Sequence, residues 1–263
     1  MKEVLHTFVV LAYKESSYLE ECIKSVINQK YKSKVVIATS TMNDYIKEIA
    51  SKYDIEIFVR ESDEKGIGLD FDYAIEIGET ELVTVAHQDD IYDYEYSFEI
   101  VNAYKKNNDA LILFPNYYEL KGVNREYKNI NLKIKKILLL PLRVKGRGKS
   151  RFVKRLILRF GDPIGCPSVT FVRKKVAFPV FNFPYKCDVD WAAWEKMSRQ
   201  KGAFVYINKY LMGHRIHDDS TTTEIINNNI RTKEDYQVLC KFWPKWIAKI
   251  IARVYKKSEK NNS

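Results

Sequence analysis

The sequence has few of the features that mark disulfide-rich, zinc-binding or membrane-spanning proteins. Its 263 residues include four widely separated cysteines, with no C-x-x-C pair and no histidine at metal-ligand spacing: Cys22, Cys166, Cys187 and Cys240. This pattern predicts free thiols in a reducing compartment. No stretch approaches the roughly 20 apolar residues of a membrane span. The short N-terminal apolar run, interrupted by Tyr13-Lys14-Glu15, is a poor signal peptide. We therefore expect a cytoplasmic protein without a transmembrane helix.

Acidic residues are missing from one long stretch. Between Lys128 and Phe160 there are twelve Lys and Arg and no Asp or Glu, so the rest of the chain has 32 basic and 34 acidic residues, a net charge of −2. A second basic excess lies in Lys241–Ser263, where seven basic residues face only Glu259. The body is thus mildly acidic and has two basic attachments, which bears on its partners.

Short apolar runs alternate with helical patterns along the first half of the chain. Strands are predicted at Thr7–Ala12, Lys34–Thr39, Ile55–Val59, Leu82–Ala86 and Ala110–Phe114, and helices at Leu19–Gln29, Tyr45–Lys52, Leu69–Ile77 and Tyr94–Lys106. Strands that alternate with helices every 20–30 residues indicate βαβ units and a parallel sheet with right-handed crossovers. We expect an α/β fold.

Two adjacent carboxylates, Asp89 and Asp90, follow the predicted strand Leu82–Ala86. Ligands of open α/β sheets bind outside the carboxyl ends of the strands. Like charges this close repel each other, and a divalent cation would relieve the repulsion, since Mg²⁺ binds carboxylates together with substrate phosphates. The alternative is a solvated turn that caps a helix starting near Asp93.

The first helix and the carboxylate pair resemble the family-2 glycosyltransferases, which have the GT-A fold. The similar residues are Tyr13-Lys14-Glu15, the helix Leu19-Glu20-Glu21-Cys22-Ile23-Lys24-Ser25-Val26-Ile27-Asn28-Gln29, and Gln88-Asp89-Asp90. The resemblance spans Thr7–Tyr118 and returns in Gly161–Thr223. It implies a GT-A (Rossmann-like) single domain with a mostly parallel central sheet flanked by helices, here with a basic helical insertion and a C-terminal helical extension.

The resemblance also implies a binding site for a nucleotide-diphospho-sugar. Mg²⁺ or Mn²⁺ would be held by Asp90 and Asp89, and UDP is the default nucleotide because the family most often uses it. One motif departs from the family: Thr39–Asp44 stands where an Asp-rich turn is usual. Glu15 could instead be a first-turn carboxylate, and Ser40-Thr41 a helix cap. The expected donor contacts are Ala12, Tyr13, Glu15, Ser40, Thr41, Asp70 and Asp89.

A second acidic stretch, Lys186–Met197, carries the candidate general base. It resembles the family motif Glu-Asp-Trp-x-x-Trp, and matching Trp191 and Trp194 puts Asp190 at the base position, with Val189 where the family has Glu. Asp188 is the fallback base. The two tryptophans would form a stacking wall for the acceptor sugar. The alternative is that Asp188 or Asp190 only caps the helix.

Near the end of the resemblance, the sequence His214-Arg215-Ile216-His217 is similar to a family Arg-x-His pattern. Arg215 could bind the diphosphate bidentately. His217 could be a further metal ligand through its neutral imidazole, although a single histidine is more often structural.

The predicted organisation has four segments. Residues 1–127 form the nucleotide-sugar-binding half, 128–160 the basic amphipathic helical insertion, 161–223 the acceptor half, and 224–263 the C-terminal helical extension with a basic tail. Basic amphipathic helices are typical of peripheral binding to anionic membranes, which points to a lipid-linked acceptor at the inner face of the cell membrane. The alternative is that both segments pack onto the body.

We therefore expect an inverting, metal-dependent glycosyltransferase of surface polysaccharide assembly. A sugar-nucleotide-forming nucleotidyltransferase is an alternative, but the turn after the first strand, Tyr13–Ser17, has no glycine to cradle a triphosphate. A nucleic-acid binder is disfavoured because the basic charge lies in helices rich in Leu and Ile. A non-catalytic sugar- or nucleotide-binding relative remains possible, since fold alone does not set activity.

Overall fold

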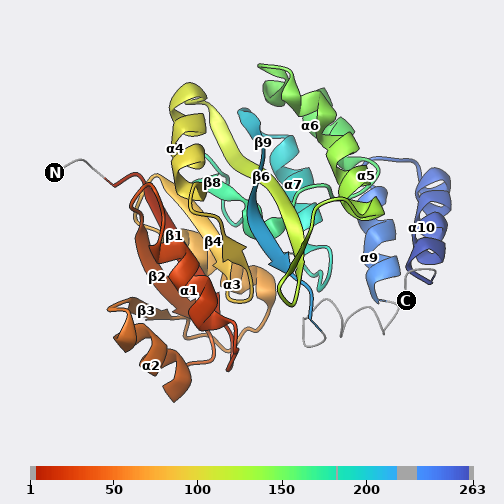
Figure 1. Cartoon of the computed structure of the whole chain (residues 1–263). Coiled ribbons are helices and arrows are strands. Elements are labelled where there is room, and N and C mark those ends of the chain that lie inside the picture. The colour runs from red at the N-terminus through yellow and green to blue at the C-terminus, as the bar shows by residue number, and fades with distance from the viewer. Residues whose placement is uncertain (1–3, 182, 218–229, 261–263) are drawn as a thin grey trace.

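The structure is a computed structural model that describes residues 4–181, 183–217 and 230–260, with side chains described up to Tyr255. Its centre is one nine-stranded sheet in the order β3-β2-β1-β4-β8-β6-β9-β5, with β7 paired to β6 (Figure 1). The strands are β1 His6–Ala12, β2 Lys34–Thr39, β3 Glu56–Val59, β4 Leu82–His87, β5 Ile91–Tyr92, β6 Ala110–Lys121, β7 Asn124–Glu126, β8 Thr170–Val172 and β9 Ala203–Arg215.

The sheet joins a parallel half to a mixed half. Strands β3, β2, β1 and β4 are parallel neighbours, and β6 is parallel to β9. Between them β8 runs antiparallel to both β4 and β6, and the short β5 and β7 also pair antiparallel. The expected α/β fold with a mostly parallel central sheet is confirmed, and a single sheet carries both halves.

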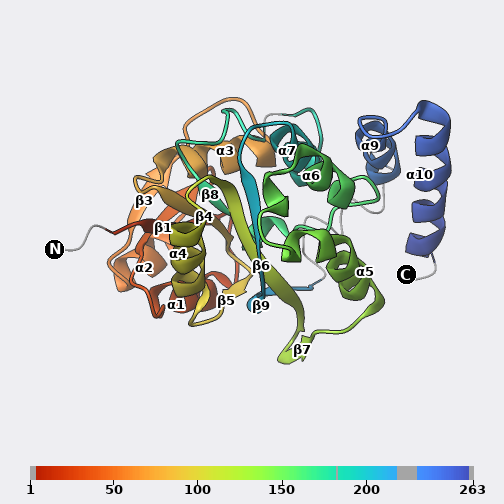
Figure 2. The same ribbon diagram turned by 90° about the horizontal axis from the view of Figure 1, so that it is seen from above.

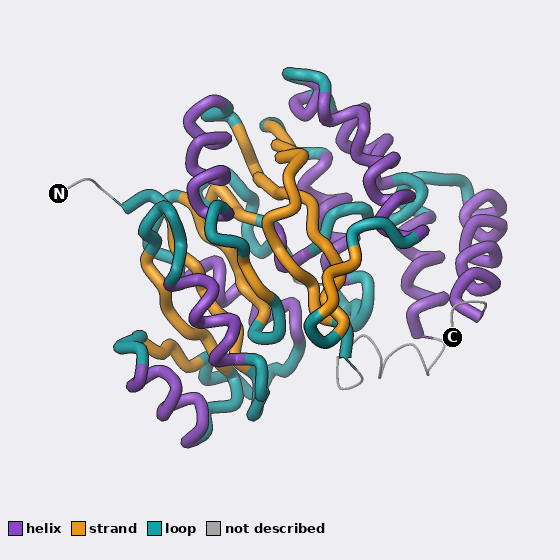
Figure 3. The backbone as a smooth tube through the Cα atoms, viewed as in Figure 1, coloured by secondary structure: helices purple, strands orange, loops and turns teal. Residues whose placement is uncertain are grey.

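Helices cover both faces of the sheet (Figures 2 and 3). On one face α1 (Leu19–Ile27), α2 (Asp44–Lys52) and α4 (Tyr96–Lys106) pack on alternate strand residues such as Phe8 and Val10. On the other face α3 (Ile67–Ile77) and α7 (Val189–Ser198) pack on residues such as Val9. Because both faces are buried, the strands are continuous apolar runs and not alternating ones.

Apart from the short turn η3 (Cys166–Ser168) beside β4 and β6, the remaining helices lie together at one end of the molecule, away from β3 (Figures 1 and 2). They are α5 (Ile130–Leu139), the short turns η1 (Leu140–Arg143) and η2 (Arg147–Lys149), α6 (Arg151–Leu158), α9 (Ile230–Leu239) and α10 (Lys245–Lys260). The tail joins the insertion directly, since Trp243 Nε1 donates to the Arg159 carbonyl oxygen at 2.7 Å. No helix within the described residues combines the length and the apolar character needed to cross a bilayer.

Two boundaries differ from the predicted ones in ways that matter for the site. Strand β6 continues past Phe114 to Lys121, because Tyr117, Tyr118 and Leu120 still pair with β9. After Asp90 the chain forms the short strand β5, and α4 begins only at Tyr96. Asp89 and Asp90 therefore do not cap a helix, and that alternative is excluded.

Candidate functional site

The carboxyl ends of β1, β2 and β4 meet at one edge of the sheet. Ala12 pairs with Thr39 and Leu11 with His87, so the turns that follow these strands lie side by side. The Gln88 side chain joins two of them: its Oε1 accepts from the Tyr13 N–H at 3.0 Å and its Nε2 donates to the Tyr13 carbonyl at 3.0 Å. This amide clamp fixes the acidic turn after β4 against the turn after β1.

Asp90 is a buried carboxylate at the centre of this turn, with 0% of its surface exposed. Its Oδ1 accepts from the Arg215 backbone N–H at 2.9 Å and lies 3.1 Å from His214 Nδ1. Burial opposes the charged imidazole, but Asp90 outweighs it and raises the pKa of His214. Asp90 Oδ2 is also buried and has no hydrogen-bond partner among the described residues. A buried carboxylate oxygen of this kind needs a further positive or donating group.

Asp89 is held in its charged form. Its Oδ2 lies 2.9 Å from His217 Nε2. Burial alone would raise the pKa of Asp89, but the His217 hydrogen bond and the nearby His87 ring outweigh it, and the pKa lies below its ordinary value. Asp89 is therefore an anion at neutral pH.

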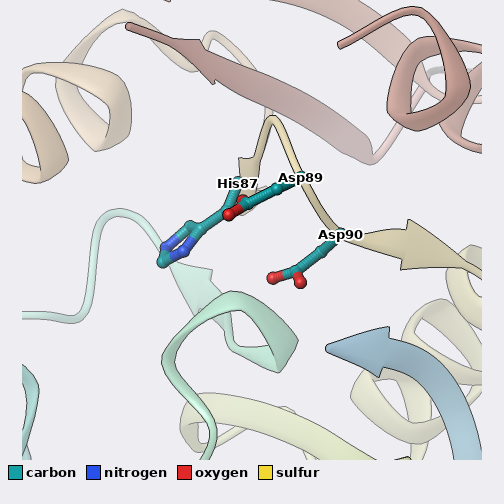
Figure 4. A group of neighbouring side chains, drawn as sticks. All are labelled: His87, Asp89 and Asp90. Atoms are coloured by element: carbon teal, nitrogen blue, oxygen red, sulfur yellow. The ribbon is translucent and has the colours of Figure 1, made fainter. Parts of the chain in front are cut away.

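His87, the last residue of β4, is a third candidate ligand that the sequence analysis missed. Its ring stacks on Phe71 at 5.1 Å, and its Nε2 is buried without a partner among the described residues. Burial lowers the pKa of His87, so the ring is neutral and can bind a metal. One ligand atom from each of His87, Asp89 and Asp90 lies within 4.8 Å of the other two (Figure 4). This donor set fits a divalent cation.

Arg215 has a different contact from the predicted one. The expected role was bidentate binding of the diphosphate. The structure instead buries Arg215 and directs its Nε to the Asp89 carbonyl oxygen at 2.9 Å, while its Nη2 donates to the Glu21 carboxylate. Its guanidinium also lies over the Tyr18 ring. Through these contacts Arg215 holds the acidic turn in place.

The predicted donor contacts lie along the same edge. Ser40 Oγ donates to Asp70 Oδ2 at 3.3 Å, and Arg60, which the sequence analysis missed, donates its Nε to Asp70 Oδ1 at 2.7 Å. Thr41 Oγ1 accepts from the Lys14 N–H at 2.6 Å. The alternative that Ser40-Thr41 caps α2 is wrong, because Asn43 caps it. Among the other predicted contacts, Ala12 is buried, whereas Tyr13 and Glu15 are exposed.

The second acidic stretch lies at the start of α7, where Asp188 and Asp190 differ strongly. Asp188 is buried, and burial together with the carboxylates of Asp235 and Asp190 raises the pKa of Asp188 to about 9. Burial thus favours the protonated form of Asp188 at neutral pH, and Asp190, whose pKa is shifted less, is the better candidate for the base. The loop before it is held by Glu234 of α9, whose carboxylate accepts from three successive backbone N–H groups, the last of them that of Asp188.

Asp190 is half-buried and lies near two ionisable groups that the sequence analysis missed, Lys135 and Asp162. Burial raises the pKa of Asp190, against the opposing effects of the Trp191 N–H, at 2.8 Å from Oδ1, and of Lys135. The pKa of Asp162 is raised further, by burial and by Asp190. Lys135 comes from α5 and donates to the Tyr117 hydroxyl at 2.8 Å. Helix α5 of the basic insertion thus places Lys135 near the carboxyl groups of Asp190 and Asp162.

Comparisons with known proteins identify the family of this chain and support its fold. The sequence model described as Glycosyl transferase family 2 matches residues 7–178. The chain belongs to this family. A search of the curated proteins found no match.

Solved structures support the same fold at low identity. The chain is similar to Staphylococcus aureus TarS 1–349 in complex with UDP-GlcNAc, with a TM-score of 0.67, 13% identity, and coverage of 95% of this chain and 70% of that one. It is also similar to the mannosyltransferase PcManGT from Pyrobaculum calidifontis in complex with GDP-Man and Mn²⁺, with a TM-score of 0.62, 15% identity and coverage of 95% and 69%. The chain covers 42% of a longer TarS chain.

In this family member the two tryptophans of α7 do not form the expected stacking wall. Trp191 is 2% exposed and Trp194 0% exposed. Trp191 Nε1 donates to the Leu158 carbonyl oxygen at 3.0 Å, and the Trp194 ring packs against Phe171 and Phe181. With both rings in the core, neither offers a face to a sugar. They fix α7 against α6 and the sheet, and so hold Asp190 in position.

Proposed function

We propose that this protein transfers a sugar from a nucleotide-diphospho-sugar to a hydroxyl acceptor, with inversion at the anomeric carbon. The single observation that carries the proposal is the ligand set of His87, Asp89 and Asp90, with Asp190 close enough for its charge to act on His87. Family membership and solved relatives in complex with UDP-GlcNAc and GDP-Man support it. UDP is the first nucleotide to test.

The donor would lie across the ends of β1, β2 and β4. The exposed Tyr13 and Glu15, the Ser40 and Thr41 hydroxyls, and the Asp70 carboxylate line this edge. A divalent cation held by His87, Asp89 and Asp90, with His217 supporting Asp89, would stabilise the negative charge that develops on the departing diphosphate. Arg215 and Gln88 keep the acidic turn in place.

The acceptor hydroxyl would be activated by Asp190. Its carboxylate takes the hydroxyl proton as the oxygen attacks the anomeric carbon on the face opposite the diphosphate. The new bond forms between the acceptor oxygen and carbon, and the bond from carbon to the diphosphate oxygen breaks with its electron pair. A carboxyl with a raised pKa is a better proton acceptor near neutral pH than an exposed aspartate.

The ligand set favours Mn²⁺ over Mg²⁺. Mg²⁺ prefers oxygen ligands in a near-ideal octahedron, whereas imidazole suits later transition metals and is accepted by Mn²⁺. The experiment is calorimetric titration of each ion into the protein with UDP. We expect tighter binding of Mn²⁺ by about tenfold or more, and loss of that preference in His87→Asp, which replaces the nitrogen by oxygen. Equal affinities in the native protein would contradict the assignment of His87.

The function is tested by a thermal-shift series of nucleoside diphosphates with and without Mn²⁺. A ligand that binds the native state raises the melting temperature by mass action. We expect one nucleotide to stabilise the protein only when Mn²⁺ is present, and Asp89→Ala to abolish that shift. Ser62→Ala, at an exposed position in the loop after β3, is the matched control. Absence of any shift for every nucleotide would overturn the proposal.

We further propose a glycan or lipid-linked acceptor from surface polysaccharide assembly. The basic insertion and tail, next to the acceptor half, support this choice.

A further inference from the structure

The helices of the insertion and the tail expose apolar side chains to solvent. Half of the large hydrophobic residues that are exposed in the described part of the chain lie in Lys128–Phe160 or on α10. In the insertion the most exposed are Ile130 at 74% and Phe152 at 70%. Scattered exposed apolar residues are ordinary, but a concentration on adjoining elements marks an interaction surface.

This exposure does not come from helices that fail to pack. Helix α5 buries Leu132 and Leu139 against the body and still exposes Ile134 and Ile137. Helix α6 buries a lysine and exposes a phenylalanine. Lys154 is buried, and its Nζ donates to the Gln200 and Gly202 carbonyl oxygens, whereas the Phe152 side chain is exposed to solvent. The insertion therefore has a second apolar face besides the one that packs, so packing onto the body does not account for its pattern.

Helix α10 repeats the arrangement. Ala248 and Ala252 face the body, while Trp246, Ile250 and Val254 recur every four residues on the solvent side. Each of these apolar residues is adjacent to an exposed basic one, namely Lys245, Lys249 and Arg253. The start of the tail contacts the end of α6, where the Phe160 and Trp243 rings lie 5.3 Å apart. The two exposed faces therefore belong to one end of the molecule (Figures 1 and 2).

The charge of these helices distinguishes between two partners that could cover the exposed apolar faces, a second copy of the chain and an anionic membrane. The insertion has twelve basic and no acidic residues, and the exposed positions around its apolar face include Lys133, Lys145 and Arg151. A second copy of the chain would bring like charge against like charge at such a face. An anionic bilayer offers both an apolar interior for the isoleucine, phenylalanine and tryptophan side chains and negative head groups for the basic ones.

We propose that the exposed faces of α5, α6 and α10 form a docking surface for an anionic membrane. The surface is defined by Ile130, Ile134, Ile137, Phe152, Trp246 and Ile250. It deepens the proposed function, on which it rests for the lipid-linked acceptor: docking would hold the acceptor half beside a substrate presented in the bilayer. Membrane docking itself does not depend on the transfer reaction.

The experiment is flotation of the full chain with vesicles of phosphatidylcholine alone or with phosphatidylglycerol, at low and high salt. We expect binding to the anionic vesicles only, weakened by salt. Ile134→Glu with Ile137→Glu, and separately Trp246→Glu, should weaken it about tenfold or more. The matched control is Val4→Glu with Ile27→Glu, two exposed apolar residues outside the insertion, the tail and the donor edge, which should bind as the native protein does.

Each variant is also melted with Mn²⁺ and the nucleoside diphosphate that stabilises the native protein. A retained shift shows that the variant is folded and that its donor site is intact. No binding of native protein to anionic vesicles would overturn the proposal, as would equal binding by all variants. A native dimer that Ile134→Glu with Ile137→Glu dissociates, without vesicle binding, would assign the surface to a second copy. Absence of any nucleotide shift in the native protein, with flotation retained, would instead defeat the proposed function alone.

Discussion

The protein has two acidic clusters near its candidate site, and their surroundings shift the pKa values of aspartate side chains in opposite directions. At the end of β4, histidine rings and the Arg215 N–H face Asp89 and Asp90, and the pKa of Asp89 lies below its ordinary value. At the start of α7, carboxyls face one another, and the pKa values of Asp188 and Asp190 are raised, mainly by burial. Asp89 therefore stays charged, whereas Asp188 and Asp190 hold their protons to higher pH than an ordinary aspartate.

This difference separates two roles that composition alone would not separate. A cluster of charged carboxylates with a buried, unpartnered oxygen is suited to a cation, whereas carboxyls with raised pKa values are suited to proton transfer. Variants of the α7 cluster test this difference, since the sequence alone left Asp190 and Asp188 as alternative candidates for the base.

The largest effect is expected for Asp190→Asn. Removing the only proton acceptor assigned to the acceptor hydroxyl should lower the turnover number by about 10³-fold, within the range for general bases. Transfer of labelled sugar measures it. The Mn²⁺-dependent nucleotide shift should be unchanged, because Asp190 is not assigned to the donor. A variant with more than a tenth of native turnover would remove Asp190 from this role.

A smaller effect is expected on the pH profile. Asp190 acts unprotonated, so the rate should fall as pH drops through its pKa, which lies above the ordinary value. The pKa of Asp162 is raised more than that of Asp190, so Asp162 is neutral while Asp190 titrates; Asp162→Asn exchanges one neutral group for another and should leave this acidic limb nearly in place. Lys135→Met removes a favourable charge and should move the limb to higher pH. A shift of the limb in Asp162→Asn as large as that in Lys135→Met would contradict the proposed electrostatics.

The smallest effect concerns stability. The pKa of Asp188 is about 9 in the folded protein, above the ordinary value of about 4. The folded state therefore holds a proton that the unfolded state has released, and stability falls as pH rises from about 4 toward 9. Asp188→Asn removes this penalty and should raise the melting temperature by a few degrees at pH 8, with little change at pH 4. A lower melting temperature at pH 8 would contradict it.

Much of the fold followed from local patterns. Apolar runs such as Thr7–Ala12 and Lys34–Thr39 became buried parallel strands with ends close to the predicted ones, because both sheet faces are covered. The resemblance carried by Leu19–Gln29 also had a structural basis: buried Gln29 donates to the Asp93 carbonyl oxygen and accepts from the Ser97 N–H, which joins α1 to α4.

The parts that sequence could not supply depend on contacts between distant segments. Lys135 and Asp162 meet Asp190 only after the insertion folds back, and no spacing in the sequence signals this. Spacing also could not tell whether Trp191 and Trp194 face a cleft or the core. His87 did carry a signal, as a polar residue ending a buried strand directly before two carboxylates.

The most direct test is anomalous scattering at the manganese edge from crystals grown with Mn²⁺ and the stabilising nucleoside diphosphate. The account predicts one strong peak in contact with Asp89 or Asp90, next to the nucleotide phosphates, and none among Asp162, Asp188 and Asp190. A peak between the α7 carboxyls, with the β4 turn directed away from bound nucleotide, would contradict it.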